Sequence, residues 1–293
     1  MVAYRGAAIL VHRIPTPIAT RGARILGRVL LRSMQSKRAL AERHQKRLTP
    51  SLASEGPAAM EHRIRETFDS YAQYWVSMFR LQGMTSQEIE ASIHVDGAEY
   101  IDAALAAGHG AIMAMAHVGA WDHGGAWLAS HWPLTIVAER LNPPALFDWF
   151  CEQRAKNGMT VVALGDEEGG KTLIRALRKN EVIGLLCDRD IAGGGVQVTF
   201  FGEKATMPAG PAMLAIRTGA RILPNAVYQR PDGSAHGVIR PPLEFVPTGK
   251  LRADIAVLTQ RLADELADLI AAAPHQWHVL APHWISDTAN SVG

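Results

Sequence analysis

The chain has 293 residues, of which 48% are hydrophobic and 20% charged, a composition typical of a globular protein with a sizeable core. Its two cysteines exclude a disulfide framework, and because no Cys/His cluster has zinc-ligand spacing we expect a reduced compartment and no metal. The net charge is only +2, but the first 48 residues carry eleven basic side chains against Glu42 alone. This asymmetry predicts an anionic partner, either a membrane surface or a nucleic acid.

The basic N-terminal region, residues 1–57, is interpreted as a helical arm, with one helix predicted over residues 20–48. Four arginines spaced by three and four residues form one stripe, and apolar residues fill other faces. Such a pair of stripes is typical of a helix that lies in a lipid interface; the alternative is a solvated charged face on a packed helix. The stripes consist of Arg21, Arg24, Arg28 and Arg32, and of Ile25, Leu26, Val29 and Leu30.

No stretch of the sequence approaches the roughly 18 apolar residues that mark a transmembrane helix. The first residues contain no apolar core followed by a small-residue cleavage site, so they do not predict a secretory signal. We therefore expect a protein that either is soluble or lies on a membrane without spanning it.

After a loop at residues 50–57, a helix is predicted over residues 58–82, with aromatic side chains that we expect in the core. Further along, short apolar runs alternate with helical segments, which indicates an α/β fold: a mixed central sheet flanked by helices, in a single domain of residues 58–293. The runs at 196–200 and 236–239 alternate in polarity and are expected as hairpin or edge strands. The other strands are predicted at 110–116, 134–138, 160–164, 182–186 and 222–228, and the helices at 122–130, 143–157, 169–179, 209–218 and 251–272.

The sharpest chemical signal is a histidine and an aspartate at the junction of a predicted strand and helix. His117 ends an apolar strand, Gly119 permits a turn, and Asp122 opens the next helix. On one continuous helix, residues five apart would point about 140° away from each other, whereas a strand-to-helix corner brings both to one rim of the sheet. The alternatives are that Asp122 only caps the helix and that His117 is a buried, hydrogen-bonded core residue.

Two later segments carry further candidates. Asp188, Arg189 and Asp190 follow a predicted strand, where they form either part of a site or a surface ion-pair cluster. Pro208 and Gly210 stand at the start of a predicted helix, where small residues would let a ligand approach closely; simple helix-on-sheet packing is the alternative.

Taken in order, these motifs resemble the lipid A lauroyl/myristoyl acyltransferase superfamily, and within it the actinobacterial phosphatidylinositol mannoside acyltransferases. The resemblance covers roughly residues 60–287. It rests on His117-x-x-x-x-Asp122, Glu139-Arg140-Leu141, Asp188-Arg189-Asp190, Phe200-Phe-Gly202-Glu203, Met207-Pro-Ala-Gly210 and Gln276-Trp277-His278 through Trp284.

The resemblance implies an acyltransferase without an acyl-enzyme intermediate, in which His117 is the general base. It implies Asp188 as the partner that orients the imidazole, although the family has the longer glutamate there, so Asp190 or Asp122 could substitute. It also places Glu139 and Arg140 near the acceptor, where Arg140 would bind a phosphate. The substrate-binding candidates are Gly119, Glu139, Arg140, Arg189, Asp190, Pro208 and Gly210.

The resemblance further implies acyl-CoA as the donor, a palmitoyl chain as the transferred group and a phosphatidylinositol mannoside as the acceptor, with no cofactor. The alternatives are a lipid A-type acceptor and a non-catalytic lipid carrier. We expect a peripheral protein on the cytoplasmic face of the cell membrane, held by an anionic surface. Nucleic acid is not expected as a partner, because the basic arm has almost no aromatic residue beyond Tyr4.

Overall fold

The structure is a computed structural model that describes residues 14–289. Its centre is a seven-stranded sheet in the order β1-β9-β8-β2-β5-β3-β4, and β6 and β7 form a separate hairpin. All neighbours in the large sheet are parallel except the antiparallel pair β8–β9, so the predicted mixed α/β sheet is confirmed. The strands are β1 (Ile93–Asp96), β2 (Ala111–Gly119), β3 (Leu134–Ala138), β4 (Met159–Ala163), β5 (Val182–Leu186), β6 (Val196–Phe200), β7 (Glu203–Met207), β8 (Arg221–Gln229) and β9 (Ala235–Ile239).

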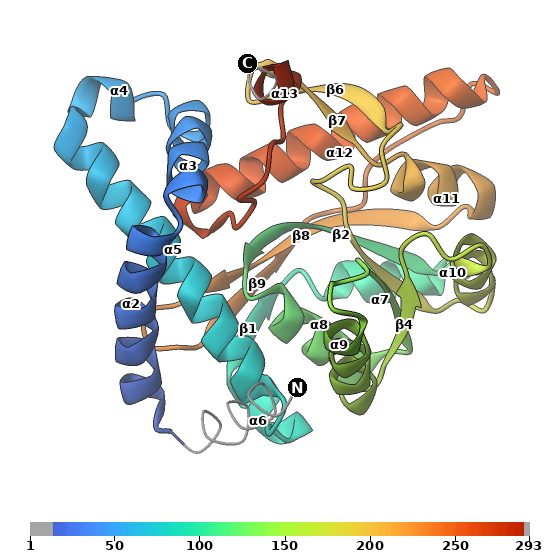
Figure 1. Cartoon of the computed structure of the whole chain (residues 1–293). Coiled ribbons are helices and arrows are strands. Elements are labelled where there is room, and N and C mark those ends of the chain that lie inside the picture. The colour runs from blue at the N-terminus through green and yellow to red at the C-terminus, as the bar shows by residue number, and fades with distance from the viewer. Residues whose placement is uncertain (1–13, 290–293) are drawn as a thin grey trace.

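Helices cover both faces of the sheet, with α12 lying across one face and α8 packed on the other (Figure 1). The alternation of β2 explains this arrangement: Ile112 and Ala114 belong to the core under α10–α12, whereas Met113 and Met115 belong to the core under α6–α8. The helices are α6 (Ser86–Ala91), α7 (Glu99–Ala106), α8 (Trp121–His131), α9 (Pro144–Lys156), α10 (Gly169–Arg178), α11 (Gly210–Thr218) and α12 (Leu251–Ala272), followed by η1 (Pro274–Gln276) and α13 (Ile285–Ala289).

The predicted strands and helices of the domain are found within a few residues of their expected places, but β1, β7, α6 and α7 were not predicted. Of the two alternatives predicted for the strand at 236–239, the hairpin is confirmed, because β9 follows β8 and pairs with it antiparallel; β9 is not an edge strand, since it lies between β1 and β8. Its alternating pattern reflects burial: Ile239 and the other residues of one face are buried in the core, whereas the residues of the other face are only half-buried.

The N-terminal arm contains two helices where one was predicted. α2 (Thr16–Ser33) ends at Met34, whose backbone is not helical, and α3 (Gln35–Leu48) begins directly after it. α2 lies along α5 (Pro57–Leu81) at the left of Figure 1, and a short α4 (Leu52–Glu55) occupies the predicted loop. None of the helices in the described part of the chain is long and apolar enough to cross a membrane.

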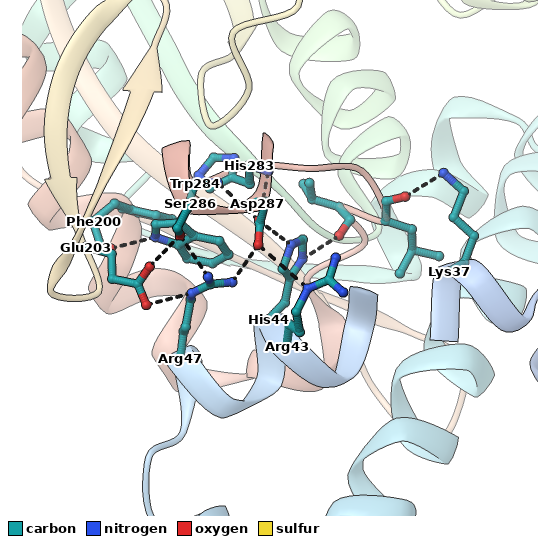
Figure 2. A network of polar contacts seen from close by, with 12 residues as sticks. Lys37, Arg43, His44, Arg47, Phe200, Glu203, His283, Trp284, Ser286 and Asp287 are labelled. Atoms are coloured by element: carbon teal, nitrogen blue, oxygen red, sulfur yellow. Dashed lines mark hydrogen bonds and ion pairs between the residues drawn. The ribbon is translucent and has the colours of Figure 1, made fainter. Parts of the chain in front are cut away.

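A polar network ties α3 to the C-terminal segment (Figure 2). The buried carboxylate of Asp287 accepts a hydrogen bond from Arg47 at 3.0 Å and lies 3.4 Å from Nε2 of the buried His44. Arg47 also donates to Glu203 on β7, at 2.8 Å. Because these contacts join three distant stretches of the chain, α3 is anchored on the body of the protein through partly buried charge-assisted bonds.

Candidate active site

The site begins where β2 turns into α8. The pairing of β2 with β8 shifts between Met115 and Gly119, and Gly119 has a left-handed backbone with φ of 61°. A Cβ added there would overlap the carbonyl oxygen of Val227, so only glycine fits this turn. The turn leaves His117 at the carboxyl-end rim of the sheet, with its side chain 15% exposed.

Asp188 reaches the same rim from the neighbouring strand β5. Cys187 extends the β5–β2 pairing by donating to the carbonyl of Met115 at 2.8 Å, which aims the next side chain at His117. The Asp188 carboxylate is fully buried, and its Oδ1 lies 2.6 Å from Nδ1 of His117. Its Oδ2 accepts from the backbone N–H of His117 at 2.9 Å and from Nε1 of Trp277 at 2.7 Å.

The surroundings of the Asp188 carboxylate determine the protonation states of Asp188 and His117. Burial alone raises the pKa of Asp188, but the charge of His117 and three donated hydrogen bonds outweigh it and lower the pKa to about 2. Asp188 is therefore an ionised acceptor at neutral pH, and Nδ1 of His117 must carry the donated hydrogen. The other ring nitrogen, Nε2, is then the basic one in a neutral imidazole.

Asp122 holds helices together rather than touching the imidazole. Its Oδ2 accepts from the hydroxyl of Tyr74 on α5 at 2.7 Å, and its Oδ1 accepts from Nε of Arg154 on α9 at 2.9 Å. Among the described residues, no hydrogen bond joins Asp122 to His117. Of the three aspartates considered from the sequence, the structure therefore places Asp188 against the histidine and assigns Asp122 contacts to α5 and α9.

The remaining polar candidates lie in the loops after β3 and β5. Arg189 forms an ion pair with Glu139 at 3.6 Å, which links the two loops. Arg140 places its guanidinium 5.8 Å from the ring centre of Phe147, and no ion pair of Arg140 is present within residues 14–289. Asp190 accepts from the backbone N–H of Gly195 at 2.8 Å, so it shapes its own loop and does not reach His117.

Pro208 and Gly210 lie at the junction of β7 and α11, where the predicted helix start is found. A Cβ added at Gly210 would have no atom within 4 Å, so this glycine leaves open space rather than allowing a close packing contact. No hydrogen bond in the described structure connects either residue to His117 or Asp188.

Three residues that donate hydrogen bonds to Asp122 or Asp188 were not predicted as part of the site. Trp277, named in the sequence only as part of a motif shared with the family, is buried and donates to Asp188. Its segment pairs with the end of β2, since Val118 bridges to Trp277 and His278 donates its N–H to the carbonyl of His117 at 2.9 Å. Tyr74 and Arg154, the partners of Asp122, carried no motif that marks them.

An apolar cavity adjoins the site between the sheet and helices α8 and α9. Trp121 is one of its lining residues: its ring centre lies 5.3 Å from that of His117 and 3.9 Å from that of Tyr74, on which it stacks. The cavity is narrow: its volume is about 50 Å³, below the roughly 300–1,000 Å³ that is usual for ligand sites. Its floor lies over Gly184, and the walls are mostly aliphatic, including Met115, Leu128, Ile136, Met159 and Leu186.

Comparisons with known proteins agree on one family. Residues 1–286 match the family model described as bacterial lipid A biosynthesis acyltransferase. The chain is 40% identical over 230 residues to the phosphatidylinositol mannoside acyltransferase of Mycobacterium tuberculosis (strain CDC 1551 / Oshkosh), covering 77% of this chain and 71% of that protein. It is likewise 40% identical to the enzyme of that name from Mycolicibacterium smegmatis, covering 78% and 74%. Similarity to the lipid A biosynthesis lauroyltransferase of Escherichia coli K12 is lower, at 25% over 245 residues, covering 83% and 78%.

Proposed function

The chain belongs to the bacterial lipid A biosynthesis acyltransferase family and is an acyltransferase, and we propose that it moves a palmitoyl chain from acyl-CoA to a mannose hydroxyl of phosphatidylinositol mannosides. The observation that carries the proposal is the bond between Nδ1 of His117 and the buried Asp188 at 2.6 Å. It supplies an oriented general base at the rim of the sheet, beside an apolar cavity.

The reaction follows from that geometry. Nε2 of His117 takes the proton of the acceptor hydroxyl while the hydroxyl oxygen attacks the thioester carbonyl carbon. The Asp188 carboxylate stabilises the imidazolium that forms, and the first N–H groups of α8, which have no partner within the helix, are the proposed donors to the developing oxyanion. The tetrahedral intermediate then expels the CoA thiolate, the C–S bond breaks, and the thiolate takes the proton from His117. The products are the ester and free CoA, with no acyl-enzyme.

The apolar cavity is the proposed site of the acyl chain. A chain that leaves water for an aliphatic surface gains about 0.8 kcal/mol per buried methylene, which favours opening of this narrow space, about 50 Å³ in volume, around a long chain. We place the acceptor headgroup at the loops of Glu139 and Arg189, which follow β3 and β5. Arg140, which has no carboxylate partner among the described residues, is the proposed ligand of the lipid phosphate.

The N-terminal helix α2 is proposed to hold the enzyme on the cytoplasmic surface of the membrane. Its buried side packs on α5, and the opposite side exposes an apolar stripe that includes Ile25, 64% exposed, and Val29, 53% exposed. The exposed Arg21, Arg28 and Arg32 flank this stripe. An apolar ridge beside a row of cations matches the interface between acyl chains and anionic headgroups.

The test is mass spectrometry of the products after incubation with palmitoyl-CoA and a panel of lipids. We expect a mass increase of one palmitoyl group on phosphatidylinositol mannosides, and none with His117→Ala, which should slow transfer at least about 10²-fold. Acylation of a lipid A precursor instead would overturn the acceptor assignment. Absence of transfer and of acyl-CoA hydrolysis would indicate a lipid carrier.

A further inference from the structure

A second cluster of ligand-bearing side chains lies at the far edge of the sheet, where β1 pairs with β9. His94 and Asp96 are two residues apart on β1, so both project from the same face of the strand. His236 stands opposite His94 in the parallel register of the two strands and projects from that same face. The intervening Ile93 and Val95 pack into the core on the other face, which fixes the direction of all three polar side chains.

The three side chains already converge on one point. Nε2 of His94 lies 3.0 Å from one oxygen of Asp96, and Nε2 of His236 lies 2.7 Å from the other. One ligand atom from each residue lies within 4.8 Å of the others. In a tetrahedral zinc site with bonds of about 2.0–2.1 Å, neighbouring ligand atoms are about 3.3 Å apart. The two imidazole–carboxylate pairs would therefore widen slightly to admit the ion, and any pair of ligand atoms as far apart as 4.8 Å would draw closer.

We propose that His94, Asp96 and His236 form a binding site for a divalent transition metal of the zinc class, with a fourth position open to water. Two imidazole nitrogens and one carboxylate oxygen favour Zn²⁺, Ni²⁺ or Cu²⁺ over Mg²⁺ and Ca²⁺, which prefer oxygen ligands. The ligands sit on paired strands rather than on loops, so little ordering is needed when the ion binds.

The position of the proposed metal site, away from His117, indicates that the ion would have a structural role. β1 is separated from β2 by β9 and β8, so the cluster lies about 14 Å from the strand of His117, at the usual spacing of about 4.8 Å per strand. At this distance the ion takes no part in acyl transfer. It instead cross-links the four-residue strand β1 to its neighbour β9 and stabilises that edge of the sheet.

The test is titration of the purified, metal-free protein with Zn²⁺ by calorimetry, and with Co²⁺ by absorption, at neutral pH. We expect one bound equivalent and visible bands of a four-coordinate cobalt site. Asp96→Asn and His236→Gln should each weaken binding at least about tenfold, since even outer partners of metal ligands are worth about 10–100-fold in affinity. Zn²⁺ should raise the melting temperature of the parent but not of either variant.

His62→Gln is the matched control, because His62 is also exposed, lies 3.4 Å from the carboxylate of Glu66 and is the one histidine of helix α5. This variant should bind Zn²⁺ like the parent. The proposal is overturned if the parent binds no equivalent of Zn²⁺ or Co²⁺. It is equally overturned if Asp96→Asn and His236→Gln bind as tightly as His62→Gln, because the ion would then occupy another place.

Discussion

Asp188 and Asp190 stand two residues apart in the chain but face different environments. Asp188 is fully buried against His117 and Trp277, whereas Asp190 binds the backbone of its own loop at Gly195. Removing the charge of each therefore tests whether the contact with the imidazole, rather than charge in this loop generally, matters for the reaction.

We predict that Asp188→Asn slows acyl transfer at least about 10²-fold with little change in donor affinity, because the imidazolium would lose its counter-charge and its fixed tautomer. Asp190→Asn, the matched control, should have a much milder effect. Steady-state kinetics with varied palmitoyl-CoA would separate turnover from binding. A greater sensitivity of Asp190 would mean that the paired carboxylate has been wrongly assigned.

Trp277 is expected to act on the reaction through Asp188, as a positioning residue. A hydrogen bond to a charged group is worth about 1.5–3 kcal/mol, so Trp277→Phe should lower kcat roughly 10-fold or more while leaving KM for the donor nearly unchanged. Trp284→Phe is the control: Trp284 is buried in the same aromatic cluster, but its indole donates to the carbonyl of Phe200 at 2.9 Å. Equal losses of kcat in both variants would show that only packing is affected.

The residues of this site that carry a local pattern could be predicted from the sequence. His117 was marked by an apolar strand followed by Gly119, and Asp188 by its place after another strand in a recognisable motif. Trp277 could not be assigned a polar role, because its acceptor is 89 residues away in the chain and a tryptophan in an apolar context predicts core packing equally well. Arg154 and Tyr74 were missed for the same reason.

At the level of elements, helix α2 is proposed to bind the membrane, whereas the reaction takes place at His117 and Asp188. We predict that replacing Arg21, Arg24, Arg28 and Arg32 with glutamine reduces pelleting with anionic vesicles, and that binding of the parent weakens as salt rises. Hydrolysis of soluble short-chain acyl-CoA should stay nearly unchanged, because α2 contributes no side chain to the His117–Asp188 contacts.

The control for this prediction is α10, which also carries cations on an exposed face. A variant with glutamine at Lys171, Arg175, Arg178 and Lys179 removes the same charge from another side of the protein and should still bind anionic vesicles like the parent. Equal loss of binding in both variants would show that net charge, not the α2 surface, attracts the vesicles.

The elements that sequence reasoning placed correctly are those with a strong internal pattern, such as β3, β5 and α12, which match to the residue. The break between α2 and α3 at Met34 was not predicted, because no glycine or proline marks it. The break lets α3 pack on the C-terminal segment, where His44 contacts Asp287, a residue 243 positions further along the chain. β1 has only four residues and becomes a strand by pairing with β9, so its own sequence carries a weak signal.

At the scale of the whole molecule, buried histidines predict a loss of stability in acid. Burial lowers the pKa of His123 and His283 to about 4 and that of His278 to about 3. Below about pH 6.5 the unfolded chain binds protons at these residues while the folded protein does not, so the free energy of unfolding falls between pH 6.5 and 4 by up to about 1.4 kcal/mol per pH unit for each histidine.

Urea denaturation at several pH values between 7.5 and 4.5 measures this dependence. His123→Asn should flatten the pH profile of the free energy of unfolding, whereas His62→Gln, at an exposed position, should leave its slope as in the parent. A free energy of unfolding that stays constant from pH 7 to 5 would contradict the expected neutral state of the buried rings.

The bonds around Asp188 also have a consequence for the order of events in refolding. The bond to His117 closes a stretch of 71 residues and the bond to Trp277 one of 89, so the site exists only when strands β2 and β5 and the segment after α12 have met. Contacts that are distant in sequence form slowly, because the entropy of closing long loops must be overcome first. After dilution from denaturant, helical structure should therefore return early and enzymatic activity last. A chaperone that binds the chain before these three segments have assembled would hold a compact but inactive protein.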